Sequence, residues 1–156
     1  MKIWISYFAQ IRHFKPWMIP ISTAAWDPKW FHDFKGNSNL YKDKNGVWNG
    51  IRLEELNPDH CCTLPPECLD CKSNKNPDIC SFLKDYKSGL DRLNFQELLD
   101  CLNKTAVYIQ QLEGFQEEPE VILVVYEAPN NKCSERGPLQ DYFMKNGVEL
   151  KEWEKP

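Results

Sequence analysis

The pattern of apolar and polar positions predicts four β-strands. Val121 to Tyr126 form a continuous, mostly β-branched apolar run between polar residues, which is typical of a strand buried on both faces. Lys2 to Phe8 alternates and is rich in β-branched and aromatic residues, and Trp17 to Ser22 is apolar enough for a second strand despite Pro20. Val148 to Trp153 alternates like an edge strand.

Helical spacing of apolar residues occurs between these strands. Ser81 to Leu93 and Phe95 to Leu112 each carry apolar residues about 3.6 positions apart, and Asn94 is suited to cap the second of these helices. Gly114 to Pro119 ends that helix, and a third helix opens at Ser134. The order indicates an α/β fold, a small Rossmann-like layer fold of about four mostly parallel strands with flanking helices.

Length and composition favour one folded domain. The chain has 156 residues, of which 42% are hydrophobic and 13% aromatic, enough for a substantial core and too many for a disordered protein. We expect a single domain over residues 1–156, with residues 58–80 a cysteine-rich insert. The net charge of −4 argues against binding long nucleic acid without sequence preference, because that needs a clustered positive face. A short anionic ligand held by a local arginine remains compatible with this charge.

Targeting and membrane signals are weak. No apolar run approaches the roughly 18 residues needed to cross a bilayer, and the amino terminus lacks a long apolar stretch followed by a small-residue cleavage site. Seven cysteines is an odd count, and five of them lie between Cys61 and Cys80, which fits metal binding in a reducing compartment better than a disulfide framework. We expect a cytoplasmic protein without a membrane partner.

The cysteine-rich insert predicts a structural zinc site. Cys68 and Cys71 have the spacing at which two thiolates hold one ion from a tight turn. The expected ligands are Cys62, Cys68, Cys71 and Cys80. Cys61 or His60 are alternatives to Cys62, and an iron–sulfur cluster or unliganded thiols are alternatives to zinc. Because four cysteines leave no open position for a substrate, we expect the zinc to order the loop.

Polar and reactive side chains follow the predicted central strand. Glu127 comes directly after it, and Cys133, Ser134 and Arg136 lie at the start of the third helix. Ligands of open α/β sheets bind beyond the carboxyl ends of the strands, where a helix start offers N–H groups to an anion. We therefore expect Glu127, Cys133 and Arg136 as catalytic residues and Ser134 as a ligand-binding residue. The alternative is that each is structural, with Ser134 a helix cap and Cys133 a packed thiol.

A second group of candidate ligand-binding residues lies near the end of the second strand. Trp26 and Trp30 flank a proline at the start of a short helix, and their rings could stack on a flat, base-like ligand, although core packing is the alternative. Ser22 offers a hydroxyl at the strand end.

Five segments resemble a known family in their order and spacing: KIWISYFAQIRHF, PISTAAWDPKWF, LKDYKSGLDRLNF, ILVVYEAPNNKCSER and GVELKEW. They are similar to the uncharacterised YeaO-like family of bacterial and phage genomes, whose members carry Cys-Tyr-Glu on a strand and Cys-His-Arg at a helix start. Val125 replaces the first of those cysteines, and Cys133-Ser134-Glu135-Arg136 replaces Cys-His-Arg, so the histidine is missing. The chain looks like a branch with Tyr-Glu-Ala-Pro, Cys-Ser-Glu-Arg and a cysteine-rich insert. The resemblance implies a Rossmann-like fold and no assigned activity.

Two functions fit these features. The first is binding, with or without processing, of a nucleotide-like or other phosphate-bearing ligand at the carboxyl end of the central strand. If that site is an enzyme, Glu127 is a candidate nucleophile in glycosyl transfer, with Glu135 or Asp27 as the second acid or base. Cys133 is a weaker nucleophile candidate, because only three positions separate it from Arg136. The second function is a non-catalytic interaction or ligand-sequestering protein with a possible protein partner and a structural zinc loop.

Overall fold

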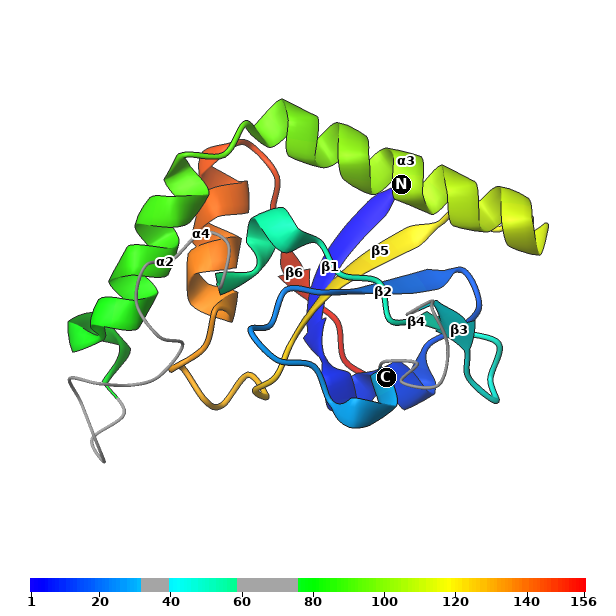
Figure 1. Cartoon of the computed structure of the whole chain (residues 1–156), viewed down its shortest axis with the longest axis horizontal. Helices are drawn as coiled ribbons and strands as arrows, with labels where there is room; N and C mark the ends of the chain where they lie inside the picture. The colour runs from blue at the N-terminus through cyan, green and yellow to red at the C-terminus, as the bar shows by residue number, and fades with distance from the viewer. Residues whose placement is uncertain (32–39, 59–75) are drawn as a thin grey trace.

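The main sheet of the protein is parallel and has four strands. The computed structural model describes residues 1–31, 40–58 and 76–156. Its strands are β1 (Lys2–Tyr7), β2 (Met18–Ser22), β5 (Glu120–Val125) and β6 (Lys151–Glu152), in the order β2-β5-β1-β6 (Figure 1). All three strand pairings are parallel. This confirms the predicted α/β class and is consistent with a Rossmann-like layer arrangement.

β5, which the sequence predicted as the central strand, lies in the interior of the sheet. β5 pairs with β1 on one side and with β2 on the other, and Val121 to Val125 are all buried. Because side chains alternate along a strand, Val121, Leu123 and Val125 pack into the core beside the helices. Ile122 and Val124 pack into a second core on the opposite face. Burial on both faces explains why the run is continuously apolar.

Both edge strands are shorter than the sequence pattern predicts, β2 by one residue and β6 by four. β2 carries Pro20 in its interior, which an edge strand tolerates because one side of its ladder is not paired within the main sheet. β6 covers only Lys151–Glu152, where the alternation had predicted Val148 to Trp153. Trp153 still donates its backbone N–H to the Ile5 carbonyl at 2.7 Å.

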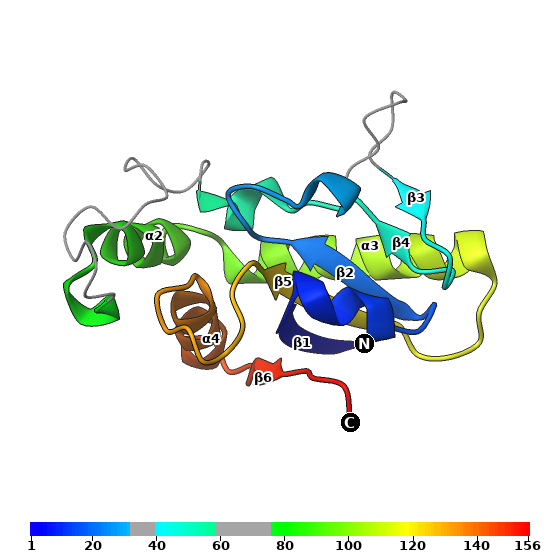
Figure 2. The same cartoon turned by 90° about the horizontal axis from the view of Figure 1, so that it is seen from below.

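In the part of the chain that the structure describes, the longer helices pack on one face of the sheet. They are α2 (Ser81–Asp91), α3 (Phe95–Glu113) and α4 (Arg136–Lys145), and Figure 2 shows α2 beside α4. The side chain of Asn94 accepts the Glu97 N–H at 3.1 Å, as a helix cap does, and Gly114 ends α3 with a φ of 70°. Buried Tyr86, Leu102 and Phe143 bring the three helices into one core with the sheet.

Short elements pack on both faces of the sheet. They are the 3₁₀ turns η1 (Phe8–His13), η2 (Lys29–Phe31), η3 (Glu54–Leu56) and η4 (Pro77–Ile79), and the hairpin of β3 (Tyr41–Lys42) and β4 (Trp48–Asn49). η3 lies on the helix side, because Leu56 belongs to the core that contains the helices, and η4 directly precedes α2. Phe8, Ile11 and Phe31 from these elements pack against the second face of β5. Figure 1 places α2 and α4 at one end of the molecule and the hairpin at the other.

Among the residues that the structure describes, no helix combines the length and the apolar character needed to span a membrane.

Candidate functional site

The loop after β5 is ordered by its own polar side chains. The Asn131 side chain accepts the Cys133 N–H at 3.1 Å, and Ser134 Oγ accepts the Arg136 N–H at 3.1 Å. Short polar side chains favour such local turns over regular structure, which is why α4 begins two residues after Ser134. Ser134 is buried, and its hydroxyl oxygen holds the first residue of α4 through the bond from the Arg136 N–H.

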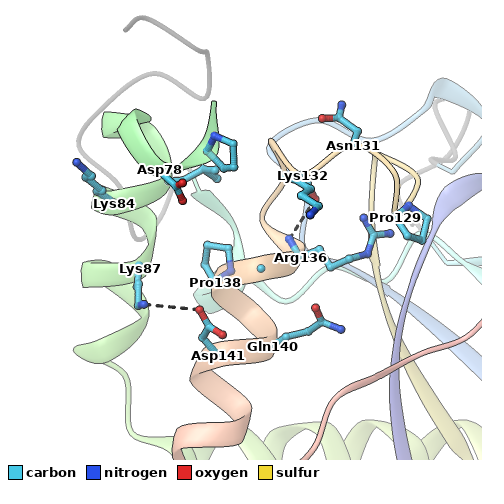
Figure 3. A pocket seen from close by; sticks show the side chains of 14 residues that line it. Asp78, Lys84, Lys87, Pro129, Asn131, Lys132, Arg136, Pro138, Gln140 and Asp141 are labelled. Atoms are coloured by element: carbon cyan, nitrogen blue, oxygen red, sulfur yellow. Dashed lines mark hydrogen bonds and ion pairs between the residues drawn. The ribbon is translucent and has the colours of Figure 1, made fainter. Parts of the chain in front are cut away.

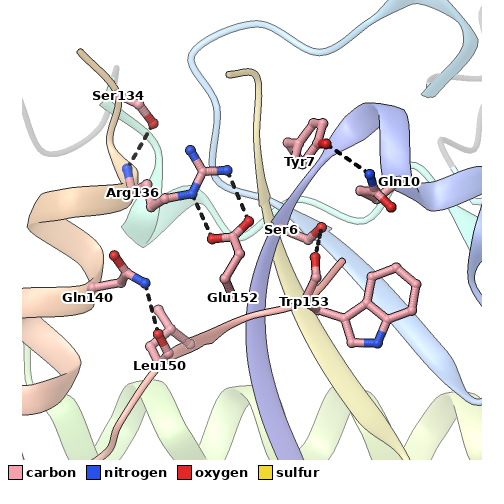
Figure 4. Close-up of polar contacts among 9 residues, drawn as sticks. All are labelled: Ser6, Tyr7, Gln10, Ser134, Arg136, Gln140, Leu150, Glu152 and Trp153. Atoms are coloured by element: carbon pink, nitrogen blue, oxygen red, sulfur yellow. Dashed lines mark hydrogen bonds and ion pairs between the residues drawn. The ribbon is translucent and has the colours of Figure 1, made fainter. Parts of the chain in front are cut away.

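Arg136 forms the principal ion pair of the site. Its Nε donates to Glu152 Oε2 at 2.8 Å and its Nη2 donates to Glu152 Oε1 at 3.3 Å (Figure 4). The guanidinium also lies 5.9 Å from the ring centroid of Tyr7. Burial raises the pKa of the Glu152 carboxyl, and the hydrogen bond and charge of Arg136 oppose that rise. One bidentate pair thus joins α4 to β6, and the Tyr7 ring brings β1 to the same guanidinium.

One N–H donor group of Arg136 has no protein acceptor. The Arg136 side chain is only 9% exposed, and its Nη1 is buried without a hydrogen-bond partner. Buried polar groups normally have a partner, because leaving a charged donor unsatisfied costs free energy. The guanidinium is therefore held in place by Glu152 with one nitrogen still able to serve an acceptor.

Two carboxyl groups lie close to this arginine. Glu135 is only 6% exposed, and burial, followed by the negative charge of Glu127, raises the pKa of Glu135 to about 7. Glu127 is half-buried, and its Oε2 has no hydrogen-bond partner. Near neutral pH a fraction of Glu135 thus carries a proton, which lessens its repulsion of Glu127.

A pocket of about 540 Å³ lies where α4 begins, between α2 and the loop after β5 (Figure 3). Ser134 and Arg136 line it, together with Lys87 and Lys132. Lys87 Nζ pairs with Asp141 across the pocket at 3.6 Å, whereas Lys132 has no ion pair within the described residues. Four cationic side chains line the pocket against two carboxylates, Asp78 and Asp141, so it has a local excess of positive charge in a chain whose net charge is −4.

The structure brings together only part of the predicted catalytic set. Arg136 and Ser134 line the pocket, but Glu127 and Cys133 are not among its lining residues. Cys133 is half-buried on the same loop. The lining of this pocket therefore does not unite Glu127, Cys133 and Arg136.

The predicted residues near β2 lie elsewhere. Ser22 is fully buried, and its hydroxyl donates to the Asp27 carboxylate. Arg52 Nη1 in turn lies 2.9 Å from Asp27 Oδ2, so a partly exposed arginine completes a polar cluster with the two buried side chains at the strand end. Trp26 and Trp30 are 61% and 51% exposed and do not line the pocket beside α4.

The predicted metal ligands lie mostly outside the described residues. Cys62, Cys68 and Cys71, with the alternatives His60 and Cys61, fall in residues 59–75. Cys80 is described, and it is buried with Phe82 and Leu83 just before α2. Residues 1–31, 40–58 and 76–156 contain no group of three or more metal-ligating side chains.

Several residues of the site were missed by the sequence patterns. Lys87 lies on α2, where charged residues between the apolar positions are expected to face solvent. The signal that places Lys87 beside Lys84 on one face of the helix is their three-residue spacing. Glu152 lies in an alternating edge segment, where a carboxylate is expected to face solvent. Its role comes from the parallel pairing of β6 with β1, which no local pattern contains.

No family model, curated protein or solved structure matches this chain. The resemblance to the YeaO-like family stays a prediction.

Proposed function

We propose that the protein binds a small phosphate-bearing ligand, such as a nucleotide, in the pocket at the start of α4. The observation that carries this proposal is Arg136, whose guanidinium is more than nine-tenths buried, fixed by Glu152, and left with Nη1 unsatisfied. Guanidinium groups bind phosphate and carboxylate oxygens with strong, charge-assisted hydrogen bonds, and the carboxylate here is already supplied by Glu152.

Further donors around the pocket support the same ligand class. Lys132 and Lys87 add positive charge, and the start of α4 adds the positive end of a helix dipole. Pro138 in the first turn has no N–H, so the side chains contribute more here than at an ordinary helix start. The ligand class is thus defined by charge and by one buried guanidinium.

Binding is better supported than catalysis. Glu135, with a pKa of about 7, could give up a proton near neutral pH, and Glu127 is the neighbouring carboxylate that glycosyl transfer would need as a nucleophile. Neither side chain lines the pocket, however. We therefore propose the binding activity and assign no reaction to these carboxylates.

The test is calorimetric titration of the purified protein with inorganic pyrophosphate. The wild type should bind it, and Lys132→Ala should bind about tenfold more weakly, because one charge-assisted contact contributes about 1.5 kcal/mol. Lys104→Ala is the matched control, since Lys104 is an exposed lysine on α3 away from the pocket, and it should bind like the wild type. Absence of binding, or equal losses in the two variants, would overturn the proposal.

A second candidate function is recognition of a protein partner, which would include the expected sequestering role. The observation that favours it is a set of exposed aromatic side chains, Trp26, Trp30 and Tyr126, the last two in ring contact with Phe8. A partner that is captured by the wild type and lost from the double variant Trp26→Ala/Tyr126→Ala would support this function. Identical capture by the two proteins would count against it.

We also propose that Cys62, Cys68, Cys71 and Cys80 hold a structural zinc ion. The spacing of the cysteines supports this, as does the burial of Cys80 at the point where the insert joins α2. Purified wild type should contain about one zinc per chain, and Cys68→Ser should contain little. Cys101→Ser is the control, because Cys101 is exposed on α3, and its zinc content should be unchanged.

A further inference from the structure

A second pocket lies at the opposite end of the molecule from the phosphate pocket. It has a volume of about 620 Å³ and is enclosed by η1, η2 and the β3–β4 hairpin. Phe8, Trp30 and Tyr41 provide aromatic walls, and Asn49 lies on β4. The two pockets share no lining residue, so this site is independent of the proposed phosphate site.

Trp30 is an exposed aromatic residue in the lining of this pocket. The residue is 51% exposed, and its two contacts with other described rings are edge contacts. The Phe8 ring lies 6.1 Å away at an interplanar angle of 89°, and the Phe31 ring lies 6.1 Å away at 83°. No described ring is stacked on the Trp30 indole, and a flat ligand could occupy that position.

Asn49 supplies a polar group that the protein itself does not satisfy. Its residue is only 1% exposed, and its Nδ2 donates to the Val47 carbonyl at 3.0 Å. That bond fixes the orientation of the amide, because the Val47 carbonyl can only accept, so the nitrogen must face it. Asn49 Oδ1 is then left buried with no donor. A buried acceptor without a donor costs free energy, which a ligand N–H would recover.

We propose that this pocket binds a planar heteroaromatic ring carrying an N–H donor, with a purine base as the fitting chemical class. The ring stacks on Trp30, and its amino group donates to Asn49 Oδ1. Aromatic walls with a few polar groups are the usual composition of a pocket for such a ring, and Arg12, Asp43, Lys44 and Asn45 line this pocket besides Asn49. The amide oxygen excludes rings that present only acceptors at that position, because two acceptors would face each other there.

The test uses two probes, 9-methyladenine and 6-dimethylamino-9-methylpurine, titrated into the full chain and followed by calorimetry. The first probe has an N–H donor only at its exocyclic amino group, and the second has none. The wild type should bind 9-methyladenine, and it should bind the dimethylated probe at least about fivefold more weakly, since an unpaired buried acceptor costs about 1 kcal/mol or more. Equal binding of the two probes, or no binding of either, would overturn the proposal.

Two variants test the assigned residues. Trp30→Ala should weaken 9-methyladenine binding about tenfold, because stacking of a base on an aromatic ring contributes about 1–3 kcal/mol. Trp26→Ala is the matched control, since Trp26 is also an exposed tryptophan but does not line this pocket. Asn49→Ala should bind both probes alike. If that variant fails to fold, the comparison of probes on the wild type still tests the amide. Unchanged binding in Trp30→Ala, or an equal loss in Trp26→Ala, would contradict the proposal.

Discussion

Arg136 shows how one residue can serve the fold and the candidate site together. Two hydrogen bonds to Glu152 join α4 to the last strand, while Nη1 is left for an acceptor. The sequence predicted a ligand-binding arginine at a helix start, and Arg136 does line the pocket at the start of α4. Its partner could not be predicted, because 16 positions separate the two residues and the pair depends on how β6 joins the sheet.

Removing the carboxylate that pairs with Arg136 should lower the stability of the fold. In Glu152→Gln the carboxylate that holds the guanidinium is lost, and we expect a loss of about 2 kcal/mol in the free energy of unfolding, measured with urea. Glu149→Gln is the control, because the Glu149 side chain is 60% exposed and pairs only with Lys151 at 3.6 Å. It should change stability by less than about 0.5 kcal/mol. Equal effects of the two substitutions would show that the Arg136 pair contributes little.

Glu135 should make stability fall as the pH rises. Its pKa is about 7 in the folded chain against an ordinary value of 4.5, so between these values the folded state holds a proton that the unfolded state has lost. The unfolded state binds fewer protons there, and the free energy of unfolding therefore decreases from pH 4.5 to pH 7. The loss is on the order of 3 kcal/mol, and it is complete above pH 7.

Glu135→Gln removes this titration. We expect the variant to be more stable than the wild type at pH 8 and to show a flatter pH profile between pH 4.5 and pH 7, because its side chain stays neutral. Urea unfolding at a series of pH values measures the difference. A variant whose profile runs parallel to the wild type would show that Glu135 titrates at its ordinary pKa.

At the scale of the elements, the helices were predicted better than the short strands. Asn94 and Gly114 bound α3 as their residue types indicate, because capping is a local interaction. β6 was overestimated, since alternation over Val148 to Trp153 cannot tell how many of these residues find a partner on β1.

Gly114 offers a clean test of helix termination. It has a φ of 70°, and a Cβ added there would have no atom within 4 Å, so Gly114→Ala meets only the cost of the left-handed backbone. We expect a loss of about 1 kcal/mol in the free energy of unfolding. Gly137→Ala in α4 is the matched control, because its Cβ would also have no atom within 4 Å and its φ is not positive. That variant should be neutral or slightly more stable, and urea unfolding of both variants measures the difference.

At the scale of the whole molecule, the last residues of the chain pair with β1 at one edge of the sheet. Trp153 accepts a hydrogen bond from Ser6 Oγ at 2.7 Å across 147 positions, and its ring lies 4.9 Å from the Phe14 ring. This contact fixes β6 and the chain end beside η1.

Trp153→Ala should therefore lower the stability of the whole domain. The substitution removes a half-buried ring from the core on the η1 face, and we expect a loss of about 2 kcal/mol, measured by urea unfolding. Trp26→Ala, at a 61% exposed position, should cost less than about 0.5 kcal/mol. A small effect of Trp153→Ala would mean that the chain end contributes little to the sheet.

The sequence by itself determined the fold class, the buried β5, the helices and the loop that carries Arg136, because apolar periodicity and capping act over a few residues. Only the tertiary structure decided which side chains meet. It separated Trp30 from Arg136 into two pockets, turned Ser22 inward onto Asp27, and gave Arg136 its partner on the last strand. Such encounters depend on strand order and register, which a parallel sheet sets through crossovers between distant segments.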